Sequence, residues 1–183
     1  MTGFRLFAYG SRPHFVAAGL AAVLLIPIWA ASFALGTPIG SDWPPTLWHS
    51  HEMMFGFIAA AIADFLLTAV PNWTGRRGLA GRPLVILLVL WLAGRLLIGT
   101  SGLWPGVLVA LGDLAFLPAV AVLIAPSLLR EGNRNTPLLG VLALLWGTDV
   151  VFHWALATGD APIAGRALLV AIDLALVLVT VAP

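Results

Sequence analysis

The run of residues 48–54, with the sequence WHSHEMM, holds the densest group of metal-binding side chains in the chain. It contains two imidazoles (His49 and His51), one carboxylate (Glu52) and two thioethers (Met53 and Met54). Imidazole suits copper, iron and zinc, and thioether adds a preference for Cu(I). In an extended segment both histidines lie on one side, whereas in a helix they point about 200° apart. The run indicates a copper or haem ligand cluster, or alternatively interfacial histidines that bond loop carbonyls.

A third histidine, His153, is expected at the same membrane level, because its predicted helix runs toward the face where His49 and His51 lie. Asp149 precedes it by four residues and is therefore on the same side of that helix. Asp149 could accept the proton of the second ring nitrogen of His153 and so orient a metal-bound imidazole. The alternative is that Asp149 neutralises Arg95. His14, beside Arg12 and Pro13, is expected at the opposite face, as an interfacial anchor or a separate site.

Several ionisable residues lie inside stretches that are otherwise apolar. At the centre of a bilayer each costs roughly 2.5–3.5 kcal/mol on insertion scales, so we expect them to face the interior of a helix bundle. They could pair with one another and only lock the helices together, with Arg95 against Asp113 or Asp149, or they could mark a site or a proton path. The residues are Asp64, Arg95, Asp113, Asp149, His153 and Asp173.

The composition requires elements that cross a membrane. Of the 183 residues, 61% are hydrophobic and only 9% are charged, far from the composition of a soluble domain. A helix needs about 20 apolar residues to span the hydrocarbon core, so the chain is long enough for about six crossings. Apolar stretches separated by Pro, Gly and Arg predict one all-α transmembrane domain over residues 1–183, with helices at about 15–35, 49–71, 83–99, 105–125, 137–158 and 163–182.

The arginines predict the orientation of this bundle. Seven of them precede the first helix or follow the second and fourth, Arg166 alone lies in the other connections, and Arg95 lies inside the third helix. The positive-inside rule therefore places both termini in the cytoplasm. Trp43, Trp48 and Trp104 are expected in an interfacial aromatic belt. The absence of cysteine excludes thiolate ligands, and no basic run suggests nucleic acid.

Five stretches resemble, in order and spacing, the amino-terminal half of the NnrS family. They are RPHF at 12–15, WHSHEMMFGF at 48–57, FLLTAVPNWTGR at 65–76, WLAGR at 91–95 and Arg134-Asn135. The resemblance implies a multi-pass protein of the bacterial inner membrane that is associated with haem and copper and linked to nitric-oxide metabolism and nitrosative stress. It also implies metal ligation by His49, His51 and His153, and it makes Asn72 and Trp73 candidate contacts.

Two other function classes compete with this reading. The intramembrane aspartates and Arg95 could form a small transporter or proton relay, and the chain could be a structural assembly module. Whether it is an enzyme stays open. Because the chain ends at Pro183 without a polar anchor, we expect a half-length member that forms a homo-oligomer in the bilayer. The alternative is a monomer whose aspartates are protonated or hydrated inside the bundle. Small residues on the second helix would provide the contact surface, namely Gly56, Ala59, Ala60 and Ala63.

Overall fold

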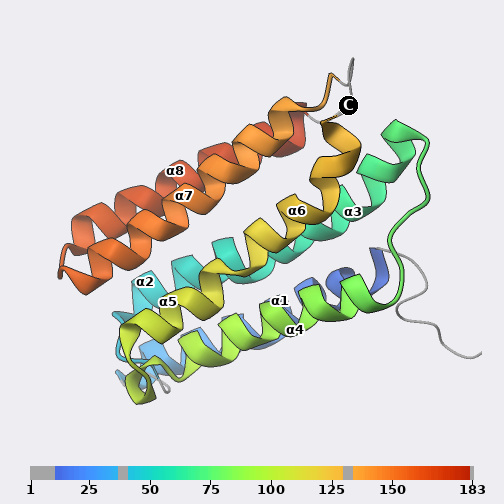
Figure 1. Ribbon diagram of the computed structural model, residues 1–183. Coiled ribbons are helices and arrows are strands. Elements are labelled where there is room, and N and C mark those ends of the chain that lie inside the picture. Colours follow the sequence, from blue (N-terminus) through green and yellow to red (C-terminus); the bar gives the residue numbers. More distant parts are fainter. Residues whose placement is uncertain (1–10, 37–40, 130–133, 182–183) are drawn as a thin grey trace, which may run out of the picture.

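The computed structural model describes residues 11–36, 41–129 and 134–181, and in these ranges the chain is helical with no strand (Figure 1). Six helical spans are long and apolar enough to cross a membrane, which confirms the expected all-α bundle. Arg5 and Arg130 lie outside the described residues. The spans are α1 (Ser11–Leu35), α2 with η2 and α3 (Pro45–His51, Glu52–Ile58 and Ala59–Thr74), α4 (Arg82–Gly99), α5 with α6 (Gly106–Leu114 and Phe116–Leu128), α7 (Pro137–Ala157) and α8 (Ala161–Val181).

The spans are arranged in three layers of two (Figure 1). Helices α1 and α4 form one outer layer, and the α7–α8 hairpin forms the other. The two broken spans lie between them, with α3 packed on α1 and α6, and α5 packed on α4 and α7. Because the middle layer contacts both outer layers, polar side chains on its helices can meet without facing lipid.

The second span begins earlier than expected and contains a wide turn. Helix α2 starts at Pro45, where a proline is favoured because the first helical N–H has no partner in any case. Residues Glu52–Ile58 then form a π-helix, closed by the N–H of Ala59, which bonds the carbonyl of Met54 five residues earlier. Such π-helical turns are frequent at functional sites. His49 and His51 therefore lie inside a helix, so the alternative of an extended histidine segment does not apply.

The fourth span is broken at Ala115 for a reason visible in the sequence. Pro118 has no N–H, so it cannot bond the carbonyl of Leu114 four residues earlier. The indole Nε1–H of Trp146 on α7 donates to this free carbonyl instead, at 3.0 Å. The break ends α5 at Leu114, two residues after Gly112, and it is in this last turn that Asp113 reaches the bundle interior.

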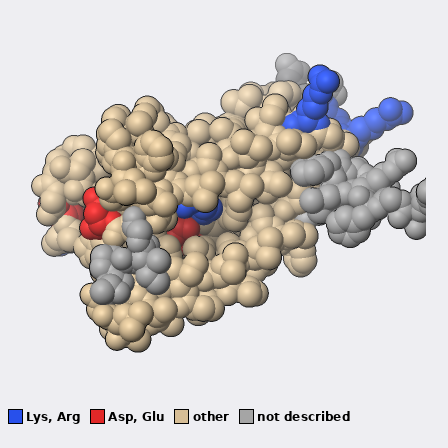
Figure 2. All heavy atoms as spheres, turned by 90° about the horizontal axis from the view of Figure 1, so that it is seen from below, with Lys and Arg blue, Asp and Glu red and all other residues tan. Residues whose placement is uncertain are grey.

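Charge separates the two ends of the bundle. Arg76, Arg77, Arg82 and Arg134 lie where α3 joins α4 and α6 joins α7, which we call the basic end. Asp42 and Asp160 lie at the opposite, acidic end, where α8 begins and where Arg166 is the exception. Figure 2 shows basic atoms at one end and acidic atoms toward the other, with one small recessed group of basic and acidic atoms between them and an otherwise uncharged surface. This pattern fits a molecule whose middle lies in lipid.

The small residues of the second span are buried inside this chain. Ala59, Ala60 and Ala63 are fully buried in the main core, and Gly56 faces Arg95. The expectation that they form a contact surface for a second copy is therefore wrong, because α1 and α6 already cover them. Self-association itself stays a prediction, now without this support.

Candidate metal centre

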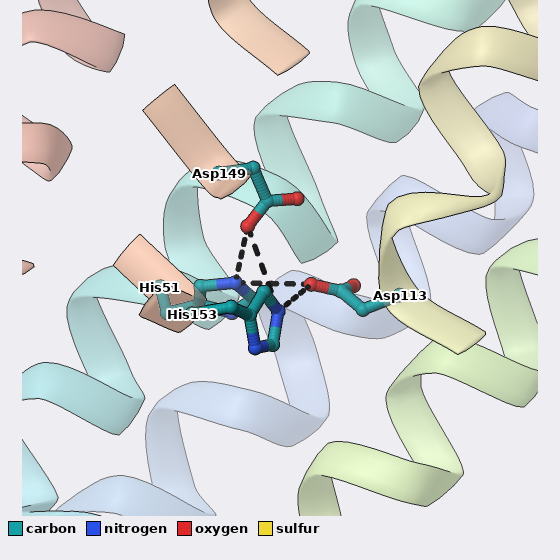
Figure 3. Close-up of side chains that lie close together, drawn as sticks. All are labelled: His51, Asp113, Asp149 and His153. Atoms are coloured by element: carbon teal, nitrogen blue, oxygen red, sulfur yellow. Dashed lines mark hydrogen bonds and ion pairs between the residues drawn. The ribbon is translucent and has the colours of Figure 1, made fainter. Parts of the chain in front are cut away.

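Two histidines and two aspartates from three spans meet in the interior of the bundle. His51, Asp113, Asp149 and His153 are all buried, and each offers one ligand atom within 4.8 Å of the others. We call this group the tetrad. Figure 3 shows the imidazoles converging between the two carboxylates. His51, Asp113 and Asp149 lie six to eight residues from the acidic ends of their helices, which is roughly 10 Å of helix.

The ring nitrogen Nε2 of each histidine lies close to both aspartates. The Nε2 atom of His51 lies 3.1 Å from Asp113 Oδ2 and 3.0 Å from Asp149 Oδ1. The Nε2 atom of His153 lies 3.0 Å from Asp113 Oδ2 and 3.8 Å from Asp149 Oδ1. Asp149 thus pairs more closely with His51 than with His153, although His153 is on its own helix. Each carboxylate faces both imidazoles.

These distances are close to those of a metal coordination shell. Nitrogen and oxygen ligands bind Zn²⁺ at 2.0–2.2 Å, and a tetrahedral arrangement at that radius separates neighbouring ligands by about 3.4 Å. The four distances of 3.0–3.8 Å lie on either side of this value. The two remaining pairs of ligand atoms, between the histidines and between the aspartates, lie within 4.8 Å, so a tetrahedral shell would require the side chains to close around the ion. Without an ion, the two shortest contacts, between His51 and Asp149 and between His153 and Asp113, are hydrogen bonds of 3.0 Å that join α2, α5 and α7.

An arginine continues the network on the side of α4. Arg95 Nη1 donates a hydrogen bond to Glu52 Oε1 at 2.9 Å, and Arg95 Nη2 donates to Asp113 Oδ1. Glu52 is 1% exposed, and its second oxygen has no hydrogen-bond partner. With neutral histidines, the carboxylates of Glu52, Asp113 and Asp149 against one guanidinium leave a formal charge of two negatives. A divalent cation would balance that charge.

Two glycines allow the helices to approach closely enough for these contacts. A Cβ at Gly56 would lie 2.8 Å from Arg95 Nη1 and 3.0 Å from Glu52 Oε2. A Cβ at Gly94 would lie 3.2 Å from both Cα and Oδ1 of Asp113. In the first case a flexible arginine would have to move, whereas in the second the backbone of α5 would be pushed away from α4.

The structure separates the ligands that the sequence places together in residues 48–54. His51 joins the tetrad, whereas His49 stacks on Trp29 with ring centroids 4.2 Å apart and has a buried Nδ1 without a partner. Met54 is buried in the apolar core and Met53 is half-buried. The reason is the helical backbone, which points residues two apart in nearly opposite directions.

Of the remaining polar residues singled out by the sequence, five lie apart from the tetrad. Asp64 is half-buried on α3, and one of its oxygens has no hydrogen-bond partner. Asp173 is exposed on α8. Asn72 and Trp73 are in the last turn of α3 at the basic end, where Trp73 packs edge-on against Phe65. His14 is fully buried, stacks on Phe116, and has no partner at either ring nitrogen.

Sequence reasoning placed Asp113 and Asp149 in a charge network and not among the ligands. Their position inside apolar spans was the available signal, but only the packing of α5 against α7 brings them to one point. Trp43 has a role that the sequence did not indicate, because it packs edge-on against both histidines of the tetrad, with centroids 5.3 Å from His51 and 5.6 Å from His153. The expected interfacial belt stays a prediction. Trp48 is buried as well, and Trp104 alone of the three is exposed.

The tetrad does not fit haem. A porphyrin held between His51 and His153 would occupy the space in which Asp113 and Asp149 lie within about 3 Å of the imidazole nitrogens. His51 is fully buried, so the macrocycle could not approach it from outside either. A single ion is the group that these residues can hold.

Comparison with known proteins agrees with the resemblance seen in the sequence. No curated protein and no solved structure shows significant similarity to the chain. One family model, described as NnrS protein, matches residues 5–182, which is nearly the whole chain. With six helices able to span a membrane and a cluster of histidine and aspartate in their midst, the chain belongs to the NnrS family of proteins.

Proposed function

We propose that the chain binds one divalent transition-metal ion, copper in the first place, at His51, Asp113, Asp149 and His153. The observation that carries the proposal is the convergence of four ligand atoms within 4.8 Å inside an apolar bundle. Burying the net negative charge that Arg95 leaves uncompensated is costly in lipid. The resemblance to the family suggests that the metal serves nitric-oxide metabolism or resistance to nitrosative stress in the bacterial inner membrane.

The ligand chemistry favours Cu²⁺ over Cu⁺. Two imidazoles and two carboxylates are borderline and hard ligands, which suit Cu²⁺, Zn²⁺ and Fe²⁺, and Cu²⁺ stands highest in the order of affinities. Soft thioether ligands would favour Cu⁺, but Met54 is packed in the apolar core. A bound ion would act here as a Lewis acid or a redox centre, and Arg95 with Glu52 would hold Asp113 in place beside it.

The second candidate is a purely structural role, which the hydrogen bonds of 3.0 Å between His51, His153 and the two aspartates favour. They would then only join the helices. A continuous relay across the membrane has less support, because Asp64 and Asp173 make no described contact with the tetrad. Metal binding by the purified protein separates the two remaining roles.

The test is to strip the protein in mild detergent with a chelator, to titrate it with Cu²⁺ and Co²⁺, and to follow absorption, electron paramagnetic resonance and metal content. We expect one ion per chain. Replacing His51 or His153 by Ala should weaken binding by at least about 100-fold, more than loss of a supporting residue costs. The matched control is His49→Ala, two residues along the same helix, which should bind metal normally. Binding that survives His51→Ala and His153→Ala would refute the proposal.

A further inference from the structure

A cavity of about 370 Å³ opens at the acidic end of the bundle beside the tetrad. Asp42, Ser101 and Trp104 border it, and Trp43 and His153 line it as well. His153 thus belongs both to the cavity and to the tetrad. It is 9% exposed, whereas His51 is fully buried, so a solute in the cavity meets the imidazole of His153 before any other tetrad member.

The carboxylate at this cavity is held in position. Ser101 Oγ donates a hydrogen bond to Asp42 Oδ1 at 2.8 Å, and Ser101 and Ser41 hydroxyls lie 2.9 Å apart. Asp42 itself is exposed. A fixed carboxylate at an opening with apolar walls attracts cations and raises their local concentration. The negatively charged tetrad network lies directly behind it.

The walls restrict passage further in. Trp43 packs its edge against the rings of His51 and His153, and Phe152 packs against Trp43 with centroids 5.4 Å apart. The side of the cavity toward His51 is therefore closed by aromatic rings, and the path that remains ends at His153. Such a cavity suits a small ion that exchanges water for imidazole.

We propose that this cavity is the access route by which a hydrated divalent cation reaches the tetrad from the acidic face of the membrane, with Asp42 as the carboxylate that first attracts it. This inference rests on the proposed metal site, but it concerns the path and not the ligands. It predicts that the rate of metal loading depends on the cavity while the affinity at equilibrium does not.

The chain contains no cysteine, so a single introduced thiol can be modified selectively. Ala157 is exposed and lines the cavity. In Ala157→Cys, metal-free protein should take up Co²⁺ at the native rate. After reaction with a bulky, charged thiol reagent, loading should slow by roughly tenfold or more, because the ion must then wait for the packed helices to open. The final Co²⁺ absorption should be unchanged. The control is Thr46→Cys, exposed on α2 outside the cavity, whose labelling should not alter the rate.

A charge variant tests the attraction separately. Asp42→Asn should slow Co²⁺ loading by about tenfold at low salt and less at high salt, while Asp173→Asn, an exposed aspartate on α8, should leave it unchanged. If Co²⁺ does not bind at equilibrium, the metal site itself is refuted. If Co²⁺ binds normally but labelled Ala157→Cys loads at the native rate, the site stands and the access route is wrong.

Discussion

Removal of Arg95 should destabilise the protein more than removal of Arg95 and Glu52 together. Among the described residues, Arg95 is the one guanidinium that contacts Glu52 and Asp113, and its side chain is 11% exposed. In Arg95→Met the aliphatic stem is kept, but Glu52 stays buried without its guanidinium partner. Adding Glu52→Gln removes that orphaned charge. The wild type should therefore be the most stable, the double variant less stable, and Arg95→Met the least stable.

The size of the effect follows from the two contacts. A hydrogen bond to a charged group contributes about 1.5–3 kcal/mol, and Arg95 makes one to each carboxylate. Breaking a buried ion pair by removing one partner costs about 3–5 kcal/mol, in the same range. Since each 1.4 kcal/mol is a factor of ten, the folding equilibrium constant of Arg95→Met should fall by roughly 10²- to 10⁴-fold. The double variant should recover about half of that free energy.

The assay is reversible unfolding in mixed micelles of mild detergent and dodecyl sulfate, followed by tryptophan fluorescence and by circular dichroism. Arg166→Met is the matched control, because Arg166 is exposed on α8, and it should unfold like the wild type. If Arg95→Met is as stable as the wild type, or if the double variant is less stable than the single one, the reasoning about an orphaned buried charge is wrong.

Two further predictions concern the approach of α4 and the orientation of the bundle. Gly94→Ala should weaken Co²⁺ binding by about tenfold or more, because its methyl group would displace the backbone at Asp113, and a small misplacement of a functional group is costly. The control Gly140→Ala, which has open space at its Cβ, should bind Co²⁺ normally. Equal Co²⁺ affinities of the two variants would contradict the close contact between Gly94 and Asp113. From the arginine asymmetry, a reporter fused after Pro183 should lie in the cytoplasm and one inserted in the 36–48 connection outside, and finding both on one side would overturn the six-span topology.

The sequence alone was enough for the architecture because lipid leaves few choices. Backbone groups in a bilayer must be satisfied within the helix, so each apolar stretch of sufficient length becomes a span. All six predicted ranges overlap the observed spans, and the largest shifts at a helix start are four residues, from 15 to Ser11 and from 49 to Pro45. The family assignment was also available from motifs, and the family match over residues 5–182 confirms it.

The sequence also indicated which polar residues matter, since a carboxylate or an arginine in an apolar stretch needs a partner. Arg95 was expected to pair with Asp113 or Asp149, and the structure selects Asp113 and adds Glu52. The pattern could not make this choice, because all three carboxylates lie at comparable depths on different helices. The distances between helices and the rotation of each one decide the pairs.

Only the tertiary structure determines which residues form the candidate metal centre. The neighbours His49 and His51 looked like one ligand pair, but a helical backbone turns them apart, so that His49 meets Trp29 and His51 meets Asp149. The tetrad instead combines residues up to 102 positions apart, from His51 to His153. Ligand chemistry is a property of residue types and can be read from the sequence, whereas a coordination shell requires atoms within a few ångströms of one point, which the packing of α2, α5 and α7 provides.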